Sequence, residues 1–222
     1  MAEQLYLARK TVIEMLEDRN YKNNFVKNIA FSYFKEIYKK FDNYSGVFDL
    51  DANNEKGERT VVKFVKTINS KISHTNGIIE TTDSTAGKKE LKDLSEFIKE
   101  ALTTDNDDTI IFIICYGDDL HEMHHTFEKN NRNVQIFHIN RLIFNITKHH
   151  LVPKHEVLNT DEKIFIKKKL LLSNYEQLPI ILTTDVIAKY HNMKHGDVCK
   201  IYRPSKNAGH HICYRYCKES VD

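Results

Sequence analysis

Residues 121–125 read H-E-M-H-H, the sharpest pattern in the sequence that could do chemistry. Two histidines four residues apart on a helix can bind zinc, and the glutamate between them can act as a base. On a helix at about 100° per residue, however, His121 and His125 point away from the apolar side. A third ligand is also needed, and His138 has no recognisable ligand spacing. We interpret these histidines as solvated, and a zinc-dependent hydrolase using His121, Glu122 and His125 remains the alternative function.

The other reactive residue types form no complete site. Histidines at 149–150, 155 and 210–211 lack cysteines or carboxylates at ligand spacing. Cys213 and Cys217 share one face of an expected strand but lie about 13 Å apart along it, too far for a disulfide. Residues 86–89 (A-G-K-K) lack the first glycine and the hydroxyl of a phosphate loop. The residues alone therefore predict no catalytic site, no metal and no cofactor.

The elements expected before residue 140 are those of an α/β unit. Apolar positions at helical spacing predict helices over residues 4–19, 26–41, 91–102 and 119–129. Strands are expected at 47–48, 61–65, 109–115 and 134–139, and residues 77–87 are expected to form a polar connector. The sequence of strand, helix and strand from 109 to 139 predicts a parallel pair, with the first strand buried on both faces.

A second, smaller α+β module is expected from residue 145. Asn159 is expected to cap a helix, with Glu162 placed to complete a capping box. A second short helix should start near Thr184 or Asp185 and run to about Tyr190. Residues 197–203 and 210–217 alternate like an antiparallel hairpin across a turn at 204–209.

Charge and composition support a division at residues 140–150. Residues 148–222 hold 13 basic and 8 acidic residues, a net charge of +5, whereas the remainder holds 20 basic and 23 acidic residues, a net charge of −3. We expect an intracellular chain with reduced cysteines, because neither a membrane-length apolar stretch nor an apolar leader is present. The expected domains are 1–142 and 145–222.

The C-terminal module resembles a known family through many motifs in order. These are Asn145-Ile146-Thr147, His149, Leu151-Val152-Pro153, His155, Gln177-Leu178-Pro179, Asp185, Ala188, Tyr190, Gly196, Val198, Lys200-Ile201, Arg203-Pro204-Ser205, Ala208-Gly209 and Tyr214-Arg215. The module is similar over residues 145–217 to the assembly domain of the fifth subunit shared by eukaryotic nuclear RNA polymerases. This family has archaeal relatives, which lack the N-terminal domain. Arg9-Lys10-Thr11-Val12, Asp18-Arg19 and Tyr21 are similar to the opening helix of the eukaryotic form.

This resemblance implies a non-catalytic subunit of a DNA-dependent RNA polymerase. It implies an N-terminal jaw domain with an inactive, restriction-nuclease-like α/β fold, lying beside downstream double-stranded DNA. The C-terminal domain is expected to dock on the largest subunit, and no cofactor or membrane is expected. The site of action would be the nucleus for a cellular protein, or the host cytoplasm or virion if the source is a large DNA virus.

A nuclease of this fold needs a carboxylate two residues before a catalytic lysine on a strand. Lys63 is in a strand-like segment, but position 61 is Val. Glu90 and Lys92 have the spacing but fall on an expected helix. A nuclease is therefore not expected.

Seven residues of the C-terminal motifs are the expected partner-binding set. Pro204 and Gly209 should fix the shape of the hairpin turn, the first through its fixed φ and the second by adopting a positive φ. Arg215 should make a charge-assisted contact, either to the partner or within the hairpin. The full set is Pro153, His155, Pro179, Arg203, Pro204, Gly209 and Arg215.

Overall fold

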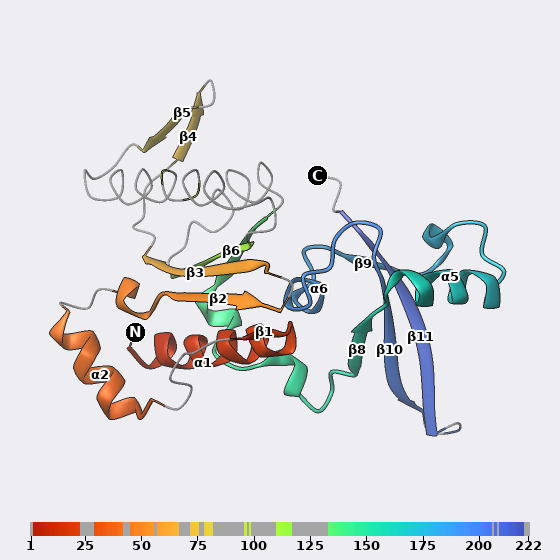
Figure 1. The fold of residues 1–222 in the computed structure, drawn as a ribbon, viewed down its shortest axis with the longest axis horizontal. Coiled ribbons are helices and arrows are strands. Elements are labelled where there is room, and N and C mark those ends of the chain that lie inside the picture. Colours follow the sequence, from red (N-terminus) through yellow and green to blue (C-terminus); the bar gives the residue numbers. More distant parts are fainter. Residues whose placement is uncertain are drawn as a thin grey trace. The chain divides into compact units, whose positions relative to one another are not determined.

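The computed structural model divides the chain into two compact units, Met1–Phe144 and Asn145–Asp222 (Figure 1). The residues that the structure describes are 2–22, 29–41, 45–55, 57–66, 72–75, 78–81, 96, 98, 110–116, 133–205, 207 and 209–219. Among them, no helix is long and apolar enough to cross a membrane.

The N-terminal unit combines helices with a five-stranded mixed sheet. Its elements are α1 (Ala2–Asp18), β1 (Tyr21–Lys22), α2 (Phe31–Lys40), β2 (Leu50–Asn54), β3 (Arg59–Lys66), β4 (Ile72–Thr75), β5 (Ile78–Thr81), β6 (Ile110–Tyr116) and β7 (Val134–His138), with 3-10 turns at Ser45–Phe48 and Ile139–Arg141. The strand order is β1-β2-β3-β6-β7. The first three strands pair antiparallel, while β3, β6 and β7 are parallel, which confirms the expected parallel pair.

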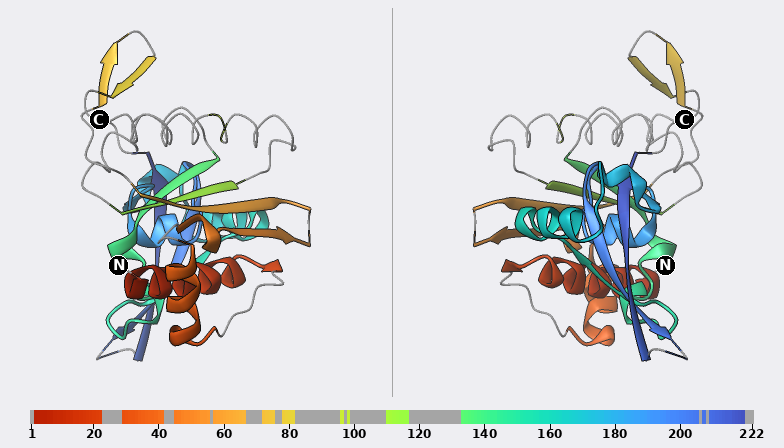
Figure 2. Two further views of the ribbon diagram at one scale, coloured as in Figure 1. Left: turned by 90° about the vertical axis from the view of Figure 1, so that its left-hand side faces the viewer. Right: turned by 90° about the vertical axis from the view of Figure 1, so that its right-hand side faces the viewer.

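Helix α1 forms because its apolar residues recur on one side, and that side is buried. Leu5, Ala8, Val12, Met15 and Leu16 are all buried, as predicted. The helix lies along one side of the sheet (Figure 2). Removing these side chains from water contributes roughly 1.5–3 kcal/mol for each of the larger ones.

Three expectations for the N-terminal unit need correction. Residues 47–48 belong to a 3-10 turn, and the strand starts at Leu50. Residues expected as a polar connector include β5, which pairs antiparallel with β4. The helix expected over residues 26–41 begins only at Phe31, after the N-cap Ala30, and its buried residue Phe34 stacks on Phe48 at 3.8 Å between ring centroids. The helices expected at 91–102 and 119–129 lie outside the described residues, apart from two positions of the first.

The C-terminal unit contains a four-stranded sheet and two helices. Its elements are β8 (Lys154–Val157), α5 (Thr160–Lys169), β9 (Ile180–Leu182), α6 (Val186–Tyr190), β10 (Val198–Ser205) and β11 (Gly209–Lys218), with 3-10 turns at Ile146–Lys148 and Tyr175–Gln177. The strand order is β8-β10-β11-β9. The pair β10–β11 is antiparallel, as expected, and β9 adds parallel to β11.

Both faces of this sheet are covered, each by a different helix. On the side we call the α6 face, the buried cluster consists of Ile181, Ala188, Met193, Cys199, Ile201 and Cys217. On the opposite side, the α5 face, it consists of Leu158, Ile166, Leu178, Val198 and Tyr216. Successive residues of a strand point to opposite faces, so β10 and β11 supply side chains to both clusters. Cys213 packs beside the α6-face cluster, and both Cys213 and Cys217 are free thiols.

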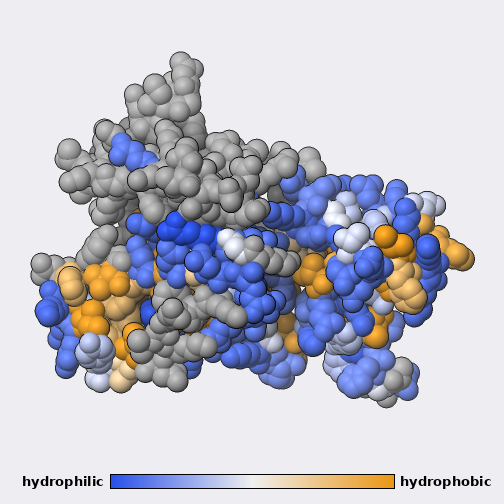
Figure 3. All heavy atoms as spheres, viewed as in Figure 1, coloured by the Kyte–Doolittle hydropathy of each residue, from blue (hydrophilic) through white to orange (hydrophobic). Residues whose placement is uncertain are grey.

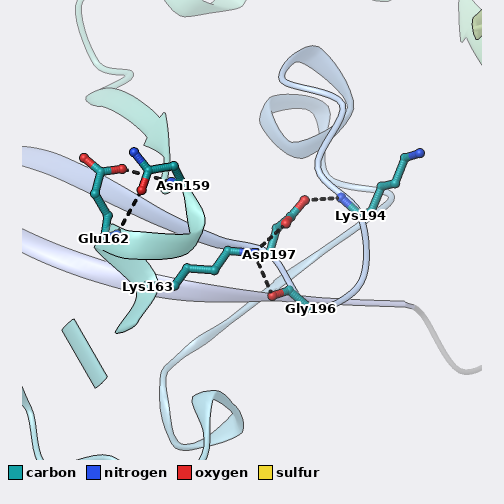
Figure 4. Close-up of polar contacts among 6 residues, drawn as sticks. All are labelled: Asn159, Glu162, Lys163, Lys194, Gly196 and Asp197. Carbon is teal, nitrogen blue, oxygen red and sulfur yellow. Dashed lines mark hydrogen bonds and ion pairs between the residues drawn. The ribbon is translucent and has the colours of Figure 1, made fainter. Parts of the chain in front are cut away.

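Helix α5 starts with the predicted capping box. The Asn159 side chain accepts from the Glu162 backbone N–H, and the Glu162 carboxylate accepts from the Asn159 N–H, both at 2.9 Å (Figure 4). Lys163 then anchors the helix to the turn before β10, donating to Asp197 Oδ1 at 2.8 Å and to the Gly196 carbonyl at 3.3 Å. Gly196 has a φ of +92°, which favours glycine at this turn.

The hairpin turn is shorter than expected. Pro204 lies within β10, opposite His210, and Ser205 pairs with Gly209, so only residues 206–208 connect the strands. Gly209 has a φ of +70°, as predicted. Pro204 lies one residue from the end of β10 and beyond the part of this strand that pairs with β8, and prolines are tolerated at such positions.

Helix α5 ends in a Schellman motif with a leucine where glycine is usual. Leu172 N–H bonds to the Lys167 carbonyl at 3.0 Å, and Leu171 N–H bonds to the Lys168 carbonyl at 3.2 Å. Leu171 has a φ of +51°. The other non-glycine residues with positive φ in the described chain are asparagines, which tolerate this conformation. Leu171 is therefore strained.

We predict that Leu171→Gly raises the free energy of unfolding of the C-terminal unit by about 0.5–1 kcal/mol. Relief of the left-handed penalty, about 1–2 kcal/mol, exceeds the backbone entropy that glycine adds to the unfolded state. Urea denaturation followed by far-UV circular dichroism measures the change. Lys168→Gly, at a right-handed position of the same helix, is the control and should lower stability by up to about 1 kcal/mol. Equal destabilisation by both substitutions would contradict the assigned strain.

Candidate functional site

The structure places the expected partner-binding residues at the edges and projecting end of the C-terminal sheet. Pro153 precedes the edge strand β8, His155 lies within it, and Pro179 precedes the other edge strand, β9. The remaining four lie on the central pair: Arg203 and Pro204 on β10, Gly209 and Arg215 on β11.

Three of the seven share the α6 face. His155 lies opposite Ile201 on β10, and Arg215 lies opposite Cys199. Arg203 follows Ile201 by two residues and so points to the same face. The registers of two separate strand pairs therefore bring one imidazole and two guanidinium groups to one side of the sheet.

The charges that act on the His155 ring come from Arg203 and Arg215 and from one further residue, Asp185. The pKa of His155 is lowered, first by burial of the ring and then by the charges of Arg215 and Arg203. A hydrogen bond to the Pro153 carbonyl and the charge of Asp185 act in the opposite direction. We call His155, Asp185, Arg203 and Arg215 the His155 cluster. Asp185 was expected only as a helix start; its position within the C-terminal motifs was the signal that could have placed it here.

Local contacts hold the cluster in place. His155 Nδ1 lies 2.7 Å from the Pro153 carbonyl oxygen. Arg215 donates from Nη1 to the Ile180 carbonyl at 3.2 Å, so this arginine makes a contact within the unit. Asp185 accepts from the Ile187 N–H at 2.8 Å and thereby caps α6. Each restraint reduces the entropy lost when these groups bind a partner.

The cluster offers charged groups for binding, and the thiols of the same face are not activated. Arg203 and Asp185 are exposed, and His155 and Arg215 are partly exposed, so two guanidinium forks are available to carboxylates. The thiols beneath are buried, and burial raises the pKa of Cys199 to about 11 and that of Cys217 to about 12. These thiols are protonated at neutral pH and are poor nucleophiles.

The remaining expected residues have structural roles. The Pro179 carbonyl accepts from Tyr216 N–H at 2.9 Å and starts the parallel β9 pairing. Pro204 is exposed and points to the α5 face, because it alternates with Arg203. Gly209 begins β11. The structure thus brings together His155, Arg203 and Arg215, with Pro153 as the hydrogen-bond acceptor of the histidine.

The described residues give no support for a metal centre. Residues 121–125 lie outside them, so the H-E-x-x-H pattern is not tested. His138 accepts from the Asn140 N–H at 3.2 Å and caps a 3-10 turn. Across the described ranges, no group of three His, Cys, Asp or Glu side chains could hold a metal ion.

Lys63 has a carboxylate neighbour that the sequence did not indicate. Asp49 precedes β2, and its Oδ2 lies 3.6 Å from Lys63 Nζ. Its Oδ1 accepts from Phe64 N–H at 2.9 Å. Burial raises the pKa of Asp49 to about 6, despite these two interactions, which lower it. Val61, at the position where a nuclease needs a second carboxylate, is buried. Glu90 and Lys92 lie outside the described residues.

Comparison with known proteins gives a consistent match. The family model of the RNA polymerase Rpb5 C-terminal domain matches residues 144–217. The subunit rpabc1 of DNA-directed RNA polymerases I, II and III of Dictyostelium discoideum is 28% identical over 225 residues, covering 96% of this chain and 97% of the relative. Subunit 5B of RNA polymerases IV and V of Arabidopsis thaliana is 25% identical, covering 95% of this chain and 88% of that one. Subunit RPABC1 of Caenorhabditis elegans is 43% identical over 74 residues, covering 33% of this chain and 35% of that relative.

The class of protein to which these matches point is a non-catalytic subunit of a multisubunit polymerase. The matched C-terminal domain and the two relatives matched over nearly the whole chain then assign it more narrowly. The C-terminal unit matches the Rpb5 C-terminal domain, and the whole chain is similar to subunits of DNA-directed RNA polymerases, which confirms the resemblance noted in the sequence. A non-catalytic polymerase subunit does not act as a zinc hydrolase, so these matches do not support that alternative. The three relatives are from cellular organisms, and nothing in them supports a viral source.

We predict that Asp49→Asn removes part of the pH dependence of stability of the N-terminal unit. The folded-state pKa, about 6, lies above the ordinary value of 3.8, so the unfolded state loses its proton first. The free energy of unfolding therefore falls as pH rises from about 4 to about 6. The variant cannot ionise and should be more stable than the wild type at pH 7, by up to about 3 kcal/mol, and equal to it at pH 4.

Hydrogen–deuterium exchange of peptides spanning β2 and β3, compared at each pH, measures this difference. Lys63→Met is the reciprocal variant, because losing the ammonium group makes the buried carboxylate still less favourable at pH 7. Parallel pH profiles for wild type and Asp49→Asn would show that Asp49 ionises normally.

Proposed function

We propose that this chain is the fifth shared subunit of nuclear RNA polymerases and docks on the largest subunit through its C-terminal unit. The relative from Dictyostelium carries the name of a subunit of polymerases I, II and III, and we propose the same membership here. The single observation that supports docking through this face is the His155 cluster. Its side chains come from three strands and a helix start, and they converge on one exposed face.

Charge and rigidity support this surface. The C-terminal unit carries a net charge of +5, whereas the N-terminal remainder carries −3. Arg203 and Arg215 offer planar donors that match the carboxylates of a partner. Pro153, Pro179, Pro204 and Gly209 act by shaping the backbone around the cluster, since prolines and a positive-φ glycine restrict the conformations of the edge and hairpin.

We propose a different role for the N-terminal unit. By the same family resemblance it is a jaw with an inactive, restriction-nuclease-like fold beside downstream DNA in the nucleus. The parallel β3-β6-β7 arrangement and the lone Asp49–Lys63 pair are compatible with that fold after loss of the catalytic carboxylate. Its net charge of −3 means that contact with DNA is local and weak, because affinity for duplex DNA comes mainly from phosphate neutralisation.

Charge reversal on the two faces of the C-terminal sheet tests the docking surface. We expect tagged full-length Arg203→Glu to recover at least about tenfold less of the two largest polymerase subunits from nuclear extract than wild type. The matched control is Lys168→Glu, an equal charge change on the exposed side of α5 at the opposite face. Equal recovery by wild type and Arg203→Glu would refute docking through the His155 cluster. Capture by residues 1–144 in place of 145–222 would refute the division of roles.

The isolated N-terminal unit should not bind duplex DNA. A fluorescence anisotropy titration of residues 1–144 with a labelled duplex at about 0.15 M salt should show no saturable binding. The folded state of the fragment is checked by circular dichroism against the full chain. Salt-dependent binding with a micromolar dissociation constant would contradict the proposed weak, local contact.

A further inference from the structure

Large apolar side chains are exposed on α5 and on the two residues that follow it. Leu171 is 90% exposed and Phe165 62%, and Ile164 and Leu170 are also exposed. The helix nevertheless has a buried residue, Ile166, which packs it against the sheet. Apolar residues gather at the surface over α5 in Figure 3. We call Ile164, Phe165, Leu170 and Leu171 the Leu171 patch. Contiguous exposed apolar residues of this kind mark interaction surfaces.

Three lysines, Lys167, Lys168 and Lys169, border the patch in the last turn of α5. Within the described part of the chain, none of them has a carboxylate at ion-pair distance. Two of them instead lie over aromatic rings: Lys167 Nζ is 5.5 Å from the ring centroid of Tyr175, and Lys169 Nζ is 6.0 Å from that of Phe165. The positive charge is therefore open to an acidic partner.

The strain at Leu171 is a second, independent indication that this surface binds a partner. A leucine in the left-handed conformation costs free energy, and a side chain 90% exposed recovers almost none by burial. Glycine would fit the same Schellman motif without the strain. A conformation that costs free energy in the free protein is explained when its side chain contacts another molecule.

We propose that the Leu171 patch binds an acidic segment of another polypeptide, with apolar side chains of that segment packed on Phe165 and Leu171. Carboxylates flanking its apolar side would pair with Lys167–Lys169, as in helix-in-groove recognition. The patch lies on the α5 face, opposite the His155 cluster. A partner can therefore be held here while the α6 face docks on the polymerase. This function goes beyond the proposed docking role.

Two other occupants fit less well. A second copy of the chain would meet the patch through a two-fold contact, which sets the lysine turn of one copy against that of the other. Like charges facing each other oppose such a dimer. Nucleic acid would use the lysines but not the apolar residues, because phosphate contacts need charge alone.

A synthetic peptide is the probe for this surface. The labelled peptide has leucines at helical spacing, with glutamates at the other positions. We expect the full-length protein to bind it with a micromolar dissociation constant that rises with salt, measured by fluorescence anisotropy. Two matched peptides, with glutamate replaced by glutamine or leucine by serine, should each bind at least about tenfold more weakly. No binding of the acidic peptide, or equal binding of all three, would overturn the proposal.

Variants of the patch locate the contact. Leu171→Gly and Phe165→Ser should each weaken peptide binding about tenfold, and Leu171→Gly should do so while raising the urea midpoint of unfolding. This combination cannot result from misfolding. Val157→Ser removes an exposed apolar residue of the α6 face and should leave peptide binding unchanged. Unchanged binding by Leu171→Gly would overturn the proposal, as would tight binding of a labelled duplex that Phe165→Ser does not weaken.

Polymerase capture separates this inference from the proposed docking role. Leu171→Gly and Lys168→Glu should still recover the large subunits, whereas Arg203→Glu should lose them and still bind the acidic peptide. If Leu171→Gly loses the large subunits, the patch is the polymerase-docking surface itself and the inference fails. If Arg203→Glu keeps them while the peptide results hold, only the docking role fails. Sedimentation velocity of the free chain should show a monomer, and a dimer abolished by Leu171→Gly would identify a second copy as the occupant.

Discussion

The alternation of side chains along β10 and β11 is the constraint on which the rest of the C-terminal unit depends. These two strands are the centre of the sheet, and each sends every second residue to the α6 face and the others to the α5 face. Val198 and Cys199 are neighbours in the sequence and are both fully buried, yet they belong to different clusters. A slip of one residue in this pairing would exchange the two faces and expose both cores. The register is therefore strongly determined, and with it the position of every group on either face.

This arrangement gives a unit of about 75 residues room for the two separate interaction surfaces that we propose. Small domains bury a limited share of their surface, so the same few elements must supply both core and contacts. The sheet and helices bury their inner sides, while polar groups of three strands and of the start of α6 form the His155 cluster on one face. On the α5 face, the exposed part of α5 and the residues just after it carry apolar side chains and lysines. A rigid body with two opposed surfaces is suited to joining one protein to another.

The N-terminal unit shows how a sheet can keep a carboxylate–lysine pair without an active site. Asp49 and Lys63 lie on adjacent elements, and burial rather than charge dominates the pKa of the carboxylate. Metal-dependent chemistry at such a position requires several oxygen ligands converging on one point. Here Val61 is buried at the position where a nuclease would need a carboxylate, and we expect the pair to affect the pH dependence of folding.

The sequence by itself determined the elements with strong local signals. Helix α1, the capping box at Asn159 and the β10–β11 hairpin follow from apolar spacing, cap chemistry and alternation, which act between residues close in the chain. The family was also visible in the sequence, because its motifs fall in order. The tertiary structure alone decided which of those motif residues meet. The pairing of His155 with Ile201, 46 residues later, places the histidine on the face that carries Arg203 and Arg215, and no local pattern encodes a register of that range. The strain at Leu171 was equally hidden, because a positive φ at a leucine arises only when the helix end and the Leu172 contact below it are both formed.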